Sequence, residues 1–329
     1  MRKKGLVERI VISEPAAEDF SASKFPSNRA KLFRYMLKNK FFKIYRNHLL
    51  IAVFFLPLII WNVLSIGYGD WIFSLEPKEG ITHFIEYWFT VYVTQIPLWM
   101  VAFWGLSGGL NVLRKLAWSD PVIFKTDFIK GIKDSGKQVS LIGFLFGVFY
   151  ALIRYGIGWL GFYSKVFDGS SSVIFGIFVC LFLLIVLIGF TVYSVCMASL
   201  YNVTFKQLII GAFKLYFADF FLATAVTCAS LLPILPILVT DLAIVVLIGY
   251  FLLFAVFIGI MIIPPFLVCQ HTFDRIINKK DYPDYYGRGL SYGVYSNSDE
   301  VNTSVEQINE GANDGETEDD FERVNDDEN

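Results

Sequence analysis

Residues able to do enzyme chemistry are few in this sequence, and their spacing brings none of them together. The three histidines, His48, His83 and His271, are far apart, and the four cysteines lie in or at the end of apolar runs, where a thiol behaves as a small hydrophobic group. Neither set has the spacing of a metal site, and the His-Glu-x-x-His pattern of zinc proteases is missing. We therefore predict that the protein is not an enzyme and that it has no catalytic residue, metal or cofactor.

The most unusual charged residue is Arg154, which interrupts a long, otherwise uncharged run that starts at Val139. A helix from Val139 carries Arg154 about 22 Å into a hydrocarbon core of about 30 Å, and so into its outer third. A cation at this depth needs a carboxylate partner or a route for its side chain to the headgroups. We predict an ion pair with Glu86, with Asp168 and Asp241 as competing partners; contact with a solute is the alternative.

Glycine spacing predicts close contact between helices. Residues 156–161 spell the G-x-G-x-x-G pattern of dinucleotide-binding proteins, but that pattern requires a preceding strand and these glycines lie within an apolar run. Two Gly-x-x-x-Gly pairs, Gly105 with Gly109 and Gly143 with Gly147, occur in consecutive apolar runs. Because small residues let membrane helices approach closely, we predict that these two runs pack against each other; contact between two copies of the chain is the alternative.

The amino-acid composition indicates which kind of secondary structure contains the residues discussed above. Of the 329 residues, 55% are apolar and only 18% are charged, and the mean hydropathy is +0.53. A water-soluble enzyme of this length would have about a quarter of its residues charged. The apolar residues also form long uncharged runs, unlike the short alternating strands of an outer-membrane barrel. The sequence therefore predicts an all-α protein that crosses a membrane several times.

Counting uncharged runs of about 20 residues predicts six transmembrane helices. The last run, residues 220–273, contains 54 residues with Asp241 as its single charge, which is long enough for two helices. The six predicted spans cover residues 48–68, 86–110, 139–163, 173–199, 219–239 and 242–268.

Basic residues predict the orientation of these spans. The segments between spans contain, in order from the N-terminus, 12, 1, 6, 1, 2, 0 and 4 Lys and Arg residues. Cytoplasmic loops collect Lys and Arg, so both termini are expected in the cytoplasm. A basic amphipathic stretch precedes each outward-going span, at residues 30–47, 124–138 and 204–219. We predict that these stretches are elbow helices lying among the headgroups, where they would meet anionic lipids.

The chain divides into three parts on this interpretation. Residues 1–47 form a basic cytoplasmic segment, residues 48–290 form the six-helix transmembrane domain, and residues 291–329 form a tail. The tail contains 13 Asp and Glu residues against one basic residue, Arg323, and has too few apolar residues to fold alone. We predict that it is disordered.

Residues 105–138 resemble the YesL-like integral membrane family, also called domain of unknown function 624. The likeness consists of a glycine cluster, a basic helix end, an acidic-Pro-Val turn and an aromatic, lysine-rich elbow. The residues that carry it outside the glycines are Arg114, Lys115, Asp120, Pro121, Phe128 and Lys137. The resemblance extends in topology from about residue 33 to 290, but the acidic tail has no counterpart. It implies an accessory role in a bacterial cell membrane, associated with carbohydrate uptake or utilisation.

These observations favour a non-catalytic, polytopic protein of the bacterial plasma membrane, whose partners are the lipid bilayer and a membrane transport protein, with no nucleic acid. A secondary transporter for a small solute and a structural membrane scaffold are the alternatives. A transporter should bring ionisable or polar residues together at mid-membrane. The polar residues within the apolar runs are few: Asn62, Thr94, Gln95, Asn111 and Arg154. Their scarcity favours the accessory role.

Overall fold

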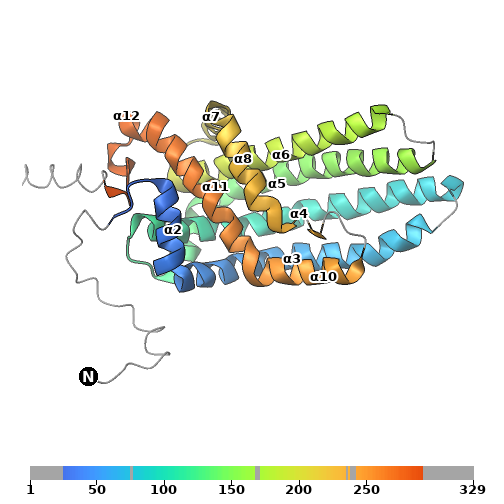
Figure 1. The fold of residues 1–329 in the computed structure, drawn as a ribbon, viewed down its shortest axis with the longest axis horizontal. Coiled ribbons are helices and arrows are strands. Elements are labelled where there is room, and N and C mark those ends of the chain that lie inside the picture. Colours follow the sequence, from blue (N-terminus) through green and yellow to red (C-terminus); the bar gives the residue numbers. More distant parts are fainter. Residues whose placement is uncertain (1–24, 75–76, 167–170, 235, 238–241, 292–329) are drawn as a thin grey trace, which may run out of the picture.

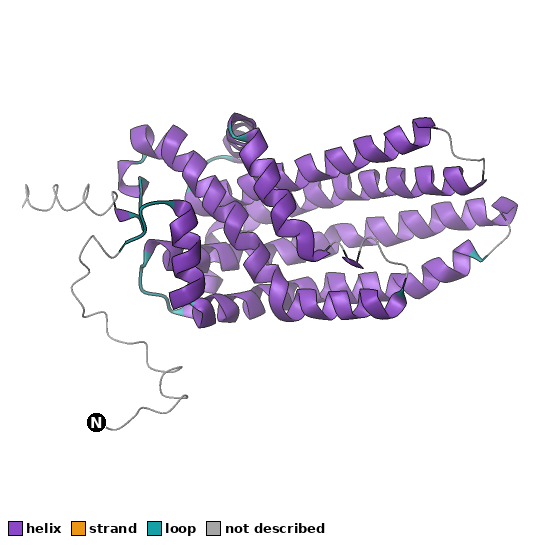
Figure 2. Ribbon diagram, in the orientation of Figure 1, coloured by secondary structure: helices purple, strands orange, loops and turns teal. Residues whose placement is uncertain are grey.

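The computed structural model describes residues 25–74, 77–166, 171–234, 236–237 and 242–291. These residues form helices joined by short connections, and no strand occurs among them (Figures 1 and 2). The predicted all-α class is therefore confirmed. The predicted tail lies outside the described residues, except for Ser291.

Four long helices make up most of the bundle, and they contain the first four predicted spans. They are α3 (Phe41–Phe73), α4 (Pro77–Trp118), α5 (Phe124–Val166) and α6 (Ser171–Leu200). At 1.5 Å per residue, α4 and α5 are each about 63 Å long, roughly twice the thickness of a hydrocarbon core. These two helices consequently extend well beyond any bilayer that the bundle crosses.

The remaining spans are less regular than the sequence suggested. Helix α7 (Phe205–Ala218) meets α8 (Phe220–Leu231) and the 3₁₀ turn Leu232–Ile234 at a bend of 92°. Helix α10 (Ala243–Leu252) continues through a π-helical turn, Leu253–Phe257, into α11 (Ile258–Phe273). The described chain thus has five helices long and apolar enough to cross a membrane, or six if the bent pair counts as one span.

Within the fifth predicted span, residues 219–239, the described α-helix ends earlier than the sequence suggested, at Leu231, and residues 235, 238 and 239 lie outside the described part of the chain. Helix α8 has 12 residues, about 18 Å, which is less than the roughly 30 Å of a hydrocarbon core. Figure 1 shows α8 and α10 reaching less far along the bundle than α4, α5 and α6. In this view the far ends of α4, α5 and α6 therefore extend past α8 and α10.

The prediction of a separate elbow helix at residues 124–138 was wrong, because these residues are the first turns of α5. The stretch is amphipathic as expected, with Lys125, Lys130 and Lys133 exposed. Its buried face contacts protein instead of lipid: the Phe128 ring lies against Gly108 of α4, within 2.9 Å of where a Cβ on that glycine would be. Because α4 already covers this face, α5 continues as one helix and does not bend into the headgroup plane.

The two other predicted elbows correspond to separate helices. The elbow predicted at residues 30–47 covers α2 (Arg29–Asn39) and the first turns of α3, which begins at Phe41 after the break at Lys40. The elbow predicted at residues 204–219 covers α7, which is separated from α8 by Asp219. Helix α2 begins where the Asn28 side chain accepts a hydrogen bond from the Lys31 amide, an N-cap. It buries one face against the bundle.

Both ends of the described chain meet at one end of the bundle. We call this the basic end and define it as α2, the connection between α4 and α5, and residues 274–291. The Ser291 amide donates to the Pro26 carbonyl oxygen at 3.1 Å, so the first and last described residues lie side by side (Figure 1). This arrangement places both ends of the described chain at the same end of the bundle; the side of the membrane that this end faces stays a prediction from the charge pattern.

Candidate functional site

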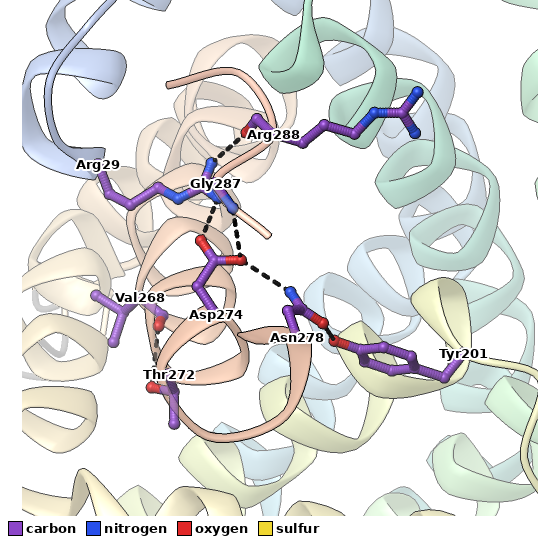
Figure 3. Close-up of polar contacts among 8 residues, drawn as sticks. All are labelled: Arg29, Tyr201, Val268, Thr272, Asp274, Asn278, Gly287 and Arg288. Atoms are coloured by element: carbon purple, nitrogen blue, oxygen red, sulfur yellow. Dashed lines mark hydrogen bonds and ion pairs between the residues drawn. The ribbon is translucent and has the colours of Figure 1, made fainter. Parts of the chain in front are cut away.

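The most elaborate polar cluster lies at the basic end, around a buried ion pair between Arg29 of α2 and Asp274 (Figure 3). Arg29 Nη2 donates to Asp274 Oδ2 at 2.5 Å, and Arg29 Nη1 donates to the Arg288 carbonyl oxygen at 3.0 Å. The side chains of the pair are only 8% and 6% exposed. The guanidinium thus joins the N-terminal helix to the end of α11 and to the last described turn.

The second oxygen of Asp274 organises the C-terminal segment. Asp274 Oδ1 accepts hydrogen bonds from Asn278 Nδ2 at 2.8 Å and from the Gly287 amide at 3.4 Å. The Tyr201 hydroxyl, just after α6, donates to Asn278 Oδ1 at 2.5 Å (Figure 3). Burial raises the pKa of Tyr201 above its ordinary value, which keeps this hydroxyl protonated as a donor.

A π-helical turn, Asp274–Asn278, brings the carboxylate and the amide of this cluster onto one face. The turn interrupts the regular helix directly after the last apolar run, and π turns of this kind often occur at functional positions. The turn also lets the short helix α12 (Lys279–Asp281) and the 3₁₀ turn Pro283–Tyr285 fold back toward α4. The Trp118 and Tyr285 rings meet there, with centroids 5.4 Å apart.

A small recess lies beside the ion pair. Its volume of about 10 Å³ is room for one water molecule. Two of its lining side chains have buried polar atoms without a partner among the described residues: both amide atoms of Gln270, and Nε of Arg29. One water molecule would satisfy some of these atoms. The recess is too small for an organic substrate, and the hydrogen bonds of the cluster join α2, the residue after α6 and the C-terminal segment.

The loop residues that carry the family resemblance form a second polar cluster at the same end. Lys115 Nζ pairs with Asp127 Oδ1 at 2.7 Å, and Asp127 Oδ2 accepts from the Ile123 amide at 2.8 Å, which caps the start of α5. Arg114 Nη1 donates to the Ser199 carbonyl oxygen of α6 at 3.2 Å. The Asp120 amide donates to the Lys115 carbonyl oxygen at 2.9 Å.

The other resemblance residues separate into two groups. Phe128 is buried, whereas Pro121 and Lys137 are exposed to the surroundings. The structure therefore brings Arg114, Lys115 and Asp120 together at the turn between α4 and α5 and leaves Lys137 outside it.

Lys40 connects this turn to the break between α2 and α3. Its Nζ donates to the Leu116 carbonyl oxygen at 2.7 Å and to Ser119 Oγ at 3.0 Å. Burial, reinforced by the nearby Lys43 ammonium and opposed by Asp120, lowers the pKa of Lys40 to about 8. The Lys40 side chain therefore takes part in the packing of the basic end. Its ammonium group loses its proton, and so its charge, at mildly alkaline pH.

Within the apolar part of the bundle, Arg154 has a different partner from the predicted one. Arg154 Nε donates to the Tyr92 hydroxyl at 3.2 Å, and the guanidinium carbon lies 5.7 Å from the centre of the Tyr92 ring. The predicted ion pair with Glu86 is not among the contacts of the described residues; Glu86 lies beside His83, with Nδ1 and Oε2 3.6 Å apart. The competing partners, Asp168 and Asp241, lie outside the described residues.

The predicted packing glycines lie against neighbouring helices, but not all against the helix we expected. A Cβ on Gly143 would come within 2.9 Å of Phe103, and a Cβ on Gly147 within 3.0 Å of Ile96, both on α4. Gly105 and Gly109 face α3 instead. A Cβ there would come within 2.6 Å of Phe54 for Gly105 and 2.3 Å of Ile51 for Gly109.

The tightest contact between α4 and α5 uses other small residues. A Cβ on Gly131 would come within 2.7 Å of Asn111 Cβ and 2.8 Å of the Ser107 carbonyl oxygen. Ser107 lies within the segment 105–109, which has the G-x-S-x-G spacing of the hydrolase nucleophile turn, a motif that needs a strand before it and a helix after it. Here Ser107 lies within α4, is fully buried and donates to the Gly131 carbonyl oxygen at 2.8 Å, so its hydroxyl serves helix packing.

Sequence reasoning did not find the cluster in Figure 3. Arg29 and Asp274 are 245 positions apart, and no motif joins them. Charged residues directly beside an apolar run are usually solvated. The only feature of the sequence that could have indicated this cluster is the position of Asp274, directly after the last apolar run. Among the described residues, no group of three or more His, Cys, Asp or Glu side chains is arranged to hold a metal ion.

Comparison of the chain with known proteins finds no matching family model, no matching curated protein and no matching solved structure. The resemblance to the YesL-like family therefore stays a prediction.

Proposed function

We propose that this chain is a non-catalytic accessory protein of a bacterial plasma membrane, which works beside a transport protein and does not itself move a solute. The observation that supports this role is how the amide side chains within the spans are used. Gln95 Nε2 donates to Asn62 Oδ1 at 3.1 Å, and Asn62 Nδ2 donates to the Leu58 carbonyl oxygen of its own helix at 2.7 Å. These amides join α3 to α4.

Two further amides serve the same purpose nearer the basic end. Asn47 Nδ2 of α3 donates to the Gly109 carbonyl oxygen of α4 at 3.0 Å, and Asn111 Nδ2 donates to the Asp127 carbonyl oxygen of α5 at 2.7 Å. Polar groups that handle a solute face a shared path, whereas the amide nitrogens of these four side chains donate to backbone or side-chain oxygens of the helices. This use is typical of a rigid helical scaffold.

An accessory protein needs a surface for its partner, and we assign this to the exposed lysines of α5. Lys125, Lys130, Lys133 and Lys137 are all exposed along the part of α5 that extends beyond the predicted hydrocarbon core. On the orientation predicted from charge, this surface faces the cytoplasm. The association with carbohydrate uptake is supported only by the resemblance of residues 105–138 to the YesL-like family.

One observation favours the alternative of a secondary transporter. Arg154 is a cation within the apolar part of the bundle, and its terminal nitrogens make no hydrogen bond among the described residues. Intramembrane cations of this kind often contact a solute or an ion.

The experiment that separates the two functions uses the purified full-length protein in proteoliposomes. We expect no uptake of labelled mono- or disaccharides above that of empty liposomes. Saturable uptake by the wild type that the Arg154→Gln variant loses would overturn the accessory proposal in favour of the transporter.

The partner surface is tested by crosslinking in intact membranes before purification. Changing the four α5 lysines to Gln should remove the crosslinked partner. A matched control variant that changes four exposed cations of α2 and early α3, Lys31, Arg34, Lys38 and Lys43, should retain it. Equal retention of the partner by both variants would show that the α5 lysines do not form the surface.

A further inference from the structure

The guanidinium of Arg154 uses only one of its three nitrogens in the described part of the chain. Nε donates to the Tyr92 hydroxyl, while Nη1 and Nη2 have no hydrogen-bond acceptor there. The side chain is partly exposed, and Tyr150 of α5 and Tyr250 of α10 are close enough to act on its charge. Among the described residues, Arg154 therefore presents a free, planar pair of N–H groups between three helices.

The surroundings hold the guanidinium in one position. Tyr92 is 6% exposed, and its ring stacks on Trp88 with centroids 4.7 Å apart and an angle of 9° between the planes. The Trp88 indole N–H is buried and has no partner among the described residues. The cation lies on a fixed aromatic stack, so little side-chain freedom is lost when a ligand meets its free nitrogens.

The site supplies more hydrogen-bond donors than acceptors. The free donors are the two terminal nitrogens of Arg154, and each tyrosine hydroxyl can donate as well. Among the described carboxylates, Glu86 is the one predicted to pair with Arg154, and it is 62% exposed beside His83 instead. A cation left unpaired in an apolar layer is unfavourable, so a ligand that brings anionic oxygens would be bound strongly.

We propose that Arg154, positioned by Tyr92, binds the phosphate group of a ligand in the outer third of the membrane, and that the phosphate belongs to an anionic phospholipid. The guanidinium fork matches phosphate oxygens in a two-point contact. The predicted depth of Arg154 favours lipid as the source, because the outer third of the hydrocarbon core is near enough to the headgroups for a lipid phosphate to meet a long side chain. The site differs from the basic end, where ordinary surface cations would meet the opposite leaflet.

The test is a lipid titration of the full-length protein in detergent, followed by native mass spectrometry. The probes are phosphatidylglycerol and a diacylglycerol with the same acyl chains, which lacks the phosphate. We expect phosphatidylglycerol to bind more tightly, and Arg154→Gln to weaken its tightest binding about tenfold, the loss typical of one charge-assisted contact. The matched control, Arg34→Gln, removes the same charge from an exposed position of α2 and should change binding less than about twofold.

Two results would overturn the proposal: equal binding of the two probes by the wild type, or unchanged binding of phosphatidylglycerol by Arg154→Gln. If Arg154→Gln does not fold, Arg154→Lys decides the matter, because it keeps the charge but lacks the fork; wild-type binding by that variant would also refute the two-point contact. Competition with inorganic phosphate identifies the source. Displacement of the lipid at the Arg154-dependent site would support a soluble phosphate ligand, and no displacement would support the lipid.

Discussion

Breaking the buried ion pair between Arg29 and Asp274 should destabilise the protein strongly and unequally from the two sides. Asp274→Asn leaves the Arg29 cation buried with the Arg288 carbonyl oxygen as its remaining partner, which should lower the free energy of unfolding by about 3–5 kcal/mol. Arg29→Gln leaves a carboxylate that still accepts from Asn278 and Gly287, so its cost should be nearer 2–3 kcal/mol.

The double variant, which has Gln at position 29 and Asn at position 274, removes both charges and should lose less stability than the sum of the single variants. We expect a coupling free energy of roughly 2 kcal/mol, measured as chemical unfolding in detergent micelles and followed by tryptophan fluorescence. A matched control exists in the chain. Arg275 and Asp219 are paired at 2.6 Å, but the Arg275 side chain is 52% exposed, so Arg275→Gln should cost about 1 kcal/mol or less. Additive losses at the buried pair, or equal losses at both pairs, would refute this reasoning.

Three further predictions concern other parts of the molecule. Gly131→Ala should lower the melting temperature clearly, because the added Cβ would come within 2.7 Å of Asn111 Cβ. Gly161→Ala should leave the melting temperature unchanged, because a Cβ at this position would have no neighbouring atom within 4 Å. Thermal melts of both variants check this prediction. Because the pKa of Lys40 is about 8 in the folded protein and 10.5 ordinarily, the unfolded state binds more protons between these values. Stability should therefore rise with pH from about 8 to about 10.5, by at most about 3 kcal/mol, and Lys40→Met should lack this rise in unfolding measured across that range. Deleting residues 292–329 keeps every described contact, so insertion and melting temperature should match the full chain; a large drop in either would show that the tail is structural.

Much of the fold could be predicted from the sequence alone, because hydropathy along a chain is a local property. A helix must satisfy its own backbone hydrogen bonds in lipid, so each long uncharged run implies a helix before any contact is known. The first four predicted spans lie within α3 to α6 for this reason. Proline and the charge at Asp241 also indicated that the last run is not a single helix. The same local pattern, however, made residues 124–138 resemble a helix on the lipid surface.

What the tertiary structure alone decided is which surface covers each side chain. An amphipathic face has the same spacing whether lipid or α4 lies against it, and only the position of Gly108 beside Phe128 distinguishes the two. Likewise, the ion pair of Arg29 and Asp274 joins residues 245 positions apart, and the partner of Arg154 depends on how α4 and α5 align. These contacts arise from packing between distant segments, and the spacing of residues within one segment carries no information about them.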